Sequence, residues 1–127
     1  MVGRLCGCDD GGMVRVLVAD DHEPFLEAAR AVVDATPGFE LVAEARTGEE
    51  AVTLATALGV DVAILDINMP GLSGIEAARR ILTYRPSTRA VLVSTYADAD
   101  VPAAARDSGA TYLRKQKFGP RTLAALA

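Results

Sequence analysis

A chain of 127 residues is long enough for about one domain with a sizeable hydrophobic core. Half of the residues are hydrophobic, but no apolar run reaches the roughly 18 residues of a membrane-spanning helix. The formal net charge of −4 argues against direct, nonspecific binding to nucleic acid.

The first twelve residues, MVGRLCGCDDGG, differ from the rest of the chain. We predict a flexible N-terminal tail over residues 1–12, which lacks the apolar core of a signal peptide, and a folded domain over residues 13–127. Cys6 and Cys8 could bind a metal, although a structural zinc site needs four ligands. The alternative is a pair of reduced thiols in a cytoplasmic protein. Met13, directly before the first predicted strand, could be the true start of the chain.

Short apolar segments follow from residue 14 onward. Three of them are nearly continuous runs of Val, Ile, Leu and Ala, which is typical of strands that are buried on both faces of a parallel sheet. The predicted strands are, in chain order, Val14–Ala19, Phe39–Ala43, Val60–Leu65, Ala90–Val93 and Tyr112–Leu113.

Helical segments alternate with these strands. Apolar residues at helical spacing predict one buried face in each of the first three helices. These faces consist of Phe25, Ala29, Val32 and Val33 in the first helix, Ala51, Leu54, Ala55 and Leu58 in the second, and Ile75, Ala78 and Leu82 in the third. A fourth helix is expected to begin near Pro102, and a fifth near Gly119.

Local signals mark where these helices begin and end. Thr47 with Glu50, and Ser73 with Glu76, form capping boxes at the start of the second and third helices. Pro37-Gly38 is expected to end the first helix and Gly59 the second.

Five strands alternating with five helices predict an α/β fold with a doubly wound, five-stranded parallel sheet. In such sheets ligands bind beyond the carboxyl ends of the strands. The residues expected there are Asp20, Asp21, Asp66, Ser94 and Lys115. Three carboxylates at one edge repel one another unless a cation lies among them, and oxygen ligands suit Mg²⁺.

Each of these polar residues also has an ordinary structural interpretation. Asp20 or Asp21 could cap the first helix, and Asp66 could begin the turn that follows its strand. Lys115 could be a surface lysine. His22 is expected to be a solvated residue at the start of a helix.

Four motifs in this order resemble the receiver domain of two-component response regulators. They are VADD, ILDINMPGLSG, VLVST and YLRK, and their order and spacing fit nearly all of residues 14–127. The DDH motif followed by Glu23-Pro24 resembles the NarL/FixJ-type branch in particular. The resemblance implies a flavodoxin-like, CheY-like sheet with the strand order 2-1-3-4-5.

The resemblance also implies a phosphorylation site and a Mg²⁺ site. Asp66 would be the phosphoacceptor, a carboxylate nucleophile that forms an acyl phosphate. The metal ligands would be Asp20, Asp21, Asp66 and the backbone carbonyl of Asn68.

Further residues would act on the phosphoryl group. Lys115 would pair with one phosphoryl oxygen and Ser94 would hydrogen-bond another. Tyr112 would be the aromatic switch residue, while Gly71 and Gly74 would shape the loop after the phosphoacceptor.

Several positions depart from the usual receiver pattern, among them Ser73, where an Asp is common, and the stretch SGATYLRK, which is one residue shorter than usual. Gln116 follows the lysine, where many receivers have proline. Tyr96 lies two residues after the serine of the fourth strand, and its bulk is predicted to hinder the water that removes the phosphoryl group.

The implied function is a signalling switch. A sensor histidine kinase would phosphorylate Asp66, and the fourth helix, fifth strand and fifth helix would change as a binding surface for a downstream protein, a fused output domain or a second copy. The domain would catalyse its own phosphorylation and dephosphorylation only, either alone or as part of a DNA-binding regulator.

The alternatives are a phosphorylation-independent interaction module and an aspartate-nucleophile phosphatase. The phosphatase would need a general acid at the position that Asn68 occupies.

Overall fold

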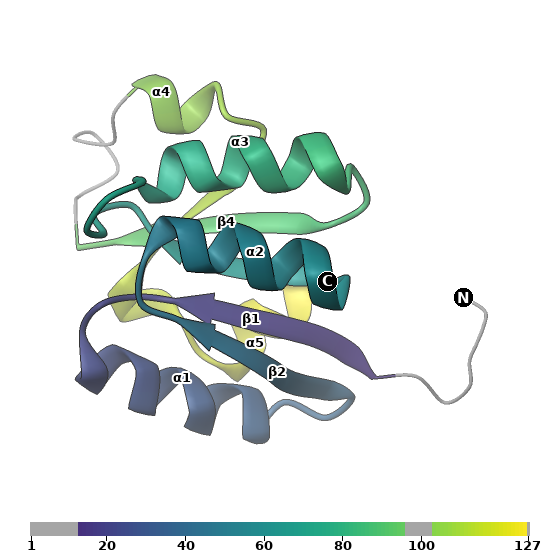
Figure 1. Ribbon diagram of the computed structural model, residues 1–127. Coiled ribbons are helices and arrows are strands. Elements are labelled where there is room, and N and C mark those ends of the chain that lie inside the picture. Colours follow the sequence, from purple (N-terminus) through teal and green to yellow (C-terminus); the bar gives the residue numbers. More distant parts are fainter. Residues whose placement is uncertain (1–12, 96–102, 127) are drawn as a thin grey trace.

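The predicted strands form one parallel sheet in the order β2-β1-β3-β4-β5. The computed structural model describes residues 13–95 and 103–126 (Figure 1). The strands are β1 (Val14–Ala19), β2 (Phe39–Ala45), β3 (Val62–Asp66), β4 (Arg89–Ser94) and β5 (Thr111–Arg114). The doubly wound fold and its strand order are therefore confirmed.

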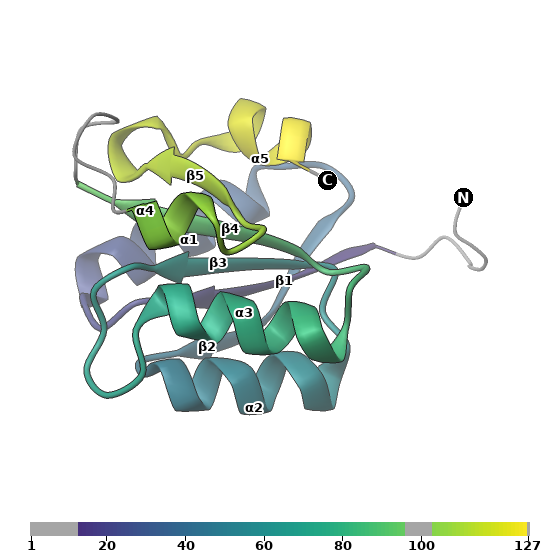
Figure 2. The same ribbon diagram turned by 90° about the horizontal axis from the view of Figure 1, so that it is seen from above.

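Helices cover both faces of this sheet (Figure 2). They are α1 (Glu23–Asp34), α2 (Gly48–Leu58), α3 (Gly74–Tyr84), α4 (Ala103–Arg106) and α5 (Pro120–Leu126), with a 3₁₀ turn, η3, at Lys115–Lys117. In Figure 2, α2 and α3 lie on one side of the sheet, and α1 and α5 lie on the other. Among the described residues, no helix has both the length and the apolar character needed to cross a bilayer.

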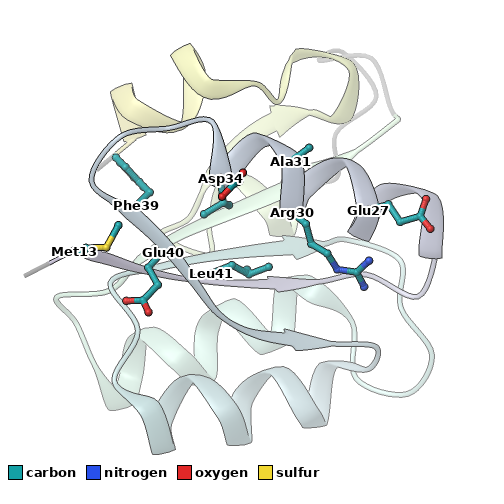
Figure 3. A pocket seen from close by; sticks show the side chains of 9 residues that line it. Met13, Glu27, Arg30, Ala31, Asp34, Phe39, Glu40 and Leu41 are labelled. Atoms are coloured by element: carbon teal, nitrogen blue, oxygen red, sulfur yellow. The ribbon is translucent and has the colours of Figure 1, made fainter.

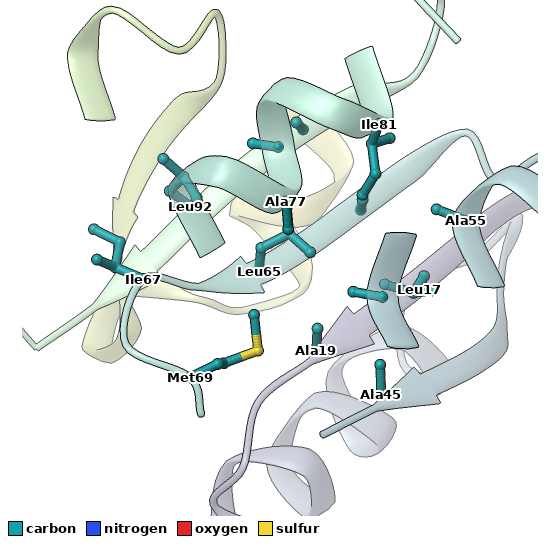
Figure 4. Packing of buried hydrophobic residues seen from close by; sticks show 14 of the residues in the cluster. Leu17, Ala19, Ala45, Ala55, Leu65, Ile67, Met69, Ala77, Ile81 and Leu92 are labelled. Carbon is teal, nitrogen blue, oxygen red and sulfur yellow. The ribbon is translucent and has the colours of Figure 1, made fainter. Parts of the chain in front are cut away.

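The side chains of each strand divide between two apolar layers. Leu17, Leu65 and Leu92 pack toward α2 and α3, in the layer that Figure 4 shows. Alternate residues, such as Val18 and Ile64, pack toward α1 and α5 on the opposite face. Because all five residues of β3 are buried, the strand that leads to Asp66 is held on both sides.

The helix signals at Thr47, Ser73 and Gly59 are present at the expected positions, whereas α1 already ends at Asp34, before Pro37-Gly38. The hydroxyl oxygens of Thr47 and Ser73 accept hydrogen bonds from the backbone N–H groups of Glu50 and Glu76, at 3.1 Å and 3.2 Å. Gly59 ends α2 in the left-handed conformation, with φ of 63°. The Glu50 carboxylate, however, accepts from the N–H of Arg46, one residue before the cap.

Several sequence-based expectations need correction. The N-cap of α1 is His22 rather than an aspartate. Strand β2 continues two residues beyond Ala43, and β3 begins at Val62 rather than Val60. Leu58, expected on the buried face of the second helix, is exposed. The expectations for Cys6, Cys8, Tyr96 and Pro102 lie outside the described residues.

Candidate functional site

The parallel strands bring the chemically active residues to one edge of the sheet. Asp20 follows the last residue of β1, and Asp66 is the last residue of β3. Ala19 pairs with Leu65 across β1 and β3, so the two carboxylates leave neighbouring strands at the same level. Lys115 follows β5 at this edge. These residues meet because the carboxyl ends of parallel strands share one edge.

The acid cluster, which we define as Asp20, Asp21, His22 and Asp66, lies at this edge. One ligand atom from each residue lies within 4.8 Å of the others. Asp20 and Asp66 are buried, whereas Asp21 and His22 are exposed. The three carboxylates supply oxygen ligands at a spacing able to bind a metal ion.

His22 takes part in this cluster, which the sequence analysis did not foresee. Its ring Nδ1 lies 3.0 Å from Asp20 Oδ1 and 3.2 Å from Asp21 Oδ1. Its backbone N–H also donates to Asp20 Oδ1, at 2.8 Å. His22 is therefore both the N-cap of α1 and a polar neighbour of the two aspartates. The DDH motif, which places His22 directly after the two aspartates, could have indicated this contact.

Lys115 is the cation that faces the buried acids. Its Nζ lies 2.7 Å from Asp20 Oδ2 and 3.5 Å from Asp66 Oδ1. The side chain is only 15% exposed, which argues against an ordinary surface lysine. An ammonium group between two carboxylates offsets part of their mutual repulsion.

Asp66 has the electrostatic character of a functional carboxylate. Burial, and secondarily the negative charge of Asp20, raise the pKa of Asp66 to about 6. The ammonium group of Lys115 and the backbone N–H of Asn68 oppose this rise. The carboxylate is therefore largely ionised at neutral pH, but its charge is poorly solvated.

The loop between β3 and α3 depends on glycine at two positions. Gly71 has φ of 73°, a conformation that other residues rarely adopt. At Gly74, a Cβ atom would lie 2.0 Å from the backbone oxygen of Asp66. The first turn of α3 thus packs directly on the backbone of the residue that carries the buried carboxylate.

Ser94 and Tyr112 lie on the two neighbouring strands β4 and β5. Ser94 is buried at the carboxyl end of β4 and pairs with Arg114 in the ladder. Tyr112 is half-buried on β5, opposite Leu92, and packs against the apolar layer on the α2 and α3 side. Gln116, at the position where many receivers have proline, is exposed and lies in η3.

A network of charged residues beside the acid cluster was also missed. Glu23, at the start of α1, contacts Arg46 at 2.5 Å and Arg30 at 3.1 Å. Arg30 also pairs with Glu44 of β2, at 2.7 Å from Nη2 to Oε1. Both arginines lower the pKa of Glu23. These exposed pairs fix the first turn of α1 against the end of β2, but each contributes little stability alone.

A groove with a volume of about 760 Å³ lies elsewhere, between α1 and β2. Met13, Phe39 and Leu41 provide its apolar lining, and Arg30 and Glu40 its charged rim (Figure 3). None of its lining residues belongs to the acid cluster. We therefore assign the chemistry to the sheet edge and not to this groove.

Comparison with known proteins points to one family. The sequence profile of the response regulator receiver domain matches residues 16–127. The chain is 35% identical over 104 residues to response regulator UvrY of Escherichia coli O6:H1. The aligned segment covers 81% of this chain and 48% of that protein. The chain is 39% identical over 111 residues to a protein-glutamate methylesterase/protein-glutamine glutaminase of Myxococcus xanthus, covering 86% and 31% respectively.

Solved structures agree with the sequence comparison. The signal receiver domain of the response regulator NarL from Mycobacterium tuberculosis superposes with a TM-score of 0.82 at 30% identity, covering 90% of this chain and 95% of that one. The chain spans about half the length of the UvrY proteins that it matches.

Proposed function

Because this chain belongs to the response regulator receiver domain family, of NarL/FixJ type, we propose that it accepts a phosphoryl group on Asp66 from a sensor histidine kinase. Phosphorylation-dependent switching is the standard function of this family. The observation that carries the assignment to Asp66 is its burial between Asp20 and Lys115 at the end of β3.

The proposed reaction uses Asp66 as a nucleophile. An ionised carboxylate oxygen forms a bond to phosphorus while the bond from phosphorus to the kinase imidazole nitrogen breaks, and the imidazole then takes up a proton. A poorly solvated carboxylate is a better nucleophile than a fully hydrated one. Lys115 lies near enough to contact an oxygen of the transferred group.

The acid cluster fits the Mg²⁺ ion that the family uses. Asp20, Asp21 and Asp66, with the backbone carbonyl of Asn68, would hold the ion, because hard cations prefer oxygen ligands. Bound Mg²⁺ would neutralise the negative charge that accumulates when a phosphoryl group meets three carboxylates.

Ser94 and Lys115 would bind the phosphoryl group once it is attached to Asp66. A phosphoryl group adds nearly two negative charges and three acceptor oxygens. Hydrogen bonds to it from two side chains would each contribute about 1.5–3 kcal/mol. Their sum approaches the roughly 5.5 kcal/mol that shifts a two-state equilibrium from 1:99 to 99:1. Tyr112, α4 and α5 are the parts that we propose to respond.

The wider context of the domain follows from its family. We propose residues 13–127 as the receiver, the cytoplasm as its location, and a downstream protein or a fused output domain as its target. A phosphorylation-dependent homodimer is consistent with this function. The domain would phosphorylate and dephosphorylate itself without turning over a separate substrate, and its net charge of −4 disfavours direct binding to nucleic acid.

Intact mass after incubation with a small phosphodonor tests the proposal. We expect a Mg²⁺-dependent gain of one phosphoryl group, which disappears in Asp66→Asn because the amide cannot act as the nucleophile. Asp34→Asn, an exposed carboxylate at the end of α1, is the matched control and should retain the gain. Removal of Mg²⁺ with a chelator should abolish the gain in both the wild type and the control.

The opposite result would favour a different function. A folded wild-type protein that never gains mass, with any donor, would favour a phosphorylation-independent interaction module. If Asp66→Asn gained as much phosphoryl group as the wild type, the phosphorylated residue would be another one.

A further inference from the structure

We propose that Phe25 is a positioning residue for Lys115, and that its ring holds the lysine ammonium over the acid cluster. The Nζ atom of Lys115 lies 4.8 Å from the centroid of the Phe25 ring. This distance is within the range of cation–π attraction, in which the electron-rich face of a ring attracts a positive charge. Phe25 comes from α1, whereas Lys115 follows β5, so the contact joins two segments far apart in the sequence.

The Phe25 ring adds a restraint that the acids alone do not give. Lys115 contacts Asp20 at 2.7 Å, but its distance to Asp66 is 3.5 Å. A lysine side chain has a flexible stem and a compact charge, so one close partner leaves it several conformations. The ring face is a further contact of the ammonium group and reduces the number of conformations open to it. The ammonium is therefore held where both buried acids can be reached.

Phe118 packs against the Phe25 ring. The rings of Phe25 and Phe118 lie 5.8 Å apart between centroids and are tilted by 38°. The backbone N–H of Phe118 donates to the carbonyl of Lys115 at 3.1 Å, closing the η3 turn. One aromatic pair thus ties the turn that carries Lys115 to helix α1. Gln116 lies inside this tied turn, so aromatic packing, rather than proline, fixes the backbone after the lysine.

This environment is substantially desolvated, which strengthens the interaction. Lys115 is 15% exposed and Asp20 is fully buried. Phe25 and Phe118 both pack against the apolar layer between the sheet, α1 and α5. Cation–π attraction is stronger at such sites than at the surface.

The first test compares Phe25→Leu with Phe25→Tyr. Leucine keeps apolar volume but removes the ring face, whereas tyrosine keeps the face. We expect Phe25→Leu to slow phosphorylation by a small phosphodonor about threefold to tenfold at saturating Mg²⁺, and Phe25→Tyr to restore most of the rate. This part of the inference rests on the proposed function.

Phe39→Leu is the matched control. Phe39 is another half-buried aromatic residue, but it begins β2 at the opposite end of the sheet. Its replacement should lower the stability without changing the phosphorylation rate of the folded protein. A similar loss of phosphorylation rate in Phe39→Leu would overturn the proposal, because a general loss of packing in the domain would then explain both effects. Failure of Phe25→Tyr to restore the rate would overturn it as well.

A double-mutant cycle tests the contact without any phosphorylation. Urea unfolding of the wild type, Phe25→Leu, Lys115→Gln and the double variant gives the coupling between the two side chains. We expect a coupling of about threefold to tenfold in the unfolding equilibrium constant. If the wild type takes up no phosphoryl group but the coupling is present, the proposed function fails and the positioning contact stands. Additive effects of the two substitutions would overturn the contact itself.

Discussion

Replacing Gly74 with alanine is expected to destabilise the fold by about 3 kcal/mol or more, within the range of severe overpacking. A Cβ atom at this position would lie 2.0 Å from the backbone oxygen of Asp66 and 3.1 Å from the Cα of Ile67. Both neighbours are backbone atoms at the end of a fully buried strand, so neither can move as a flexible side chain would. The first turn of α3 must shift instead.

Urea unfolding at neutral pH measures this loss. Gly119→Ala is the matched control, because a Cβ atom there meets nothing within 4 Å. It should change the free energy of unfolding by no more than about 1 kcal/mol, the size of a helix-capping effect before α5. The phosphorylation rate of folded Gly74→Ala should also fall, since the shift acts on the Asp66 backbone. A Gly74→Ala protein as stable as the Gly119→Ala protein would contradict the close approach.

Asp66→Asn is expected to be more stable than the wild type at pH 7, by about 2 kcal/mol and at most ~3 kcal/mol. Burial and the charge of Asp20 raise the pKa of Asp66 from 3.8 to about 6. The folded protein therefore binds this proton more tightly than the unfolded chain does. Ionising the group costs the folded state free energy, so the stability falls as the pH rises from about 4 to about 6. An amide of the same shape does not have this cost.

The pH dependence separates this cause from other effects of the substitution. The difference between Asp66→Asn and the wild type should shrink as the pH falls from 7 to 4, because the wild-type carboxyl is then protonated in the folded state. Thermal unfolding at several pH values, without Mg²⁺, measures the difference. Asp34→Asn should follow the wild type within about 0.5 kcal/mol, as exposed surface substitutions usually do. A variant that is less stable at pH 7 would show that the contact with Lys115 outweighs burial.

The sheet and the main site could be predicted from the sequence because both depend on local patterns. Continuous apolar runs predict buried parallel strands, and the ends of those strands must meet at one edge. Asp66 and Lys115 therefore lie at the same edge, and the rotamer of the lysine then decides how closely their side chains approach. The caps at Thr47 and Ser73 were predictable for the same reason, since each cap is formed within four residues.

Contacts between side chains from distant segments could not be predicted in this way. Phe25 and Phe118 meet only because α1 and η3 pack on the same face of the sheet, and no sequence period relates them. Glu23 and Arg46 are likewise 23 residues apart. Strand β2 was predicted too short because Glu44 interrupts its apolar run. At the edge of a sheet a charged residue can pair its backbone while its side chain binds an ionic partner, as Glu44 does with Val18 in the ladder and with Arg30 of α1.

Strand β2 has a hydrogen-bonded neighbour on one side only, within the part of the chain that the structure describes. Its free edge carries the backbone groups on which another extended chain could assemble. Glu40 lies exposed on this strand, and two copies paired edge to edge would bring two such carboxylates close together. Edge-to-edge pairing at β2 is therefore disfavoured, and replacing Glu40 with valine would remove that protection against aggregation.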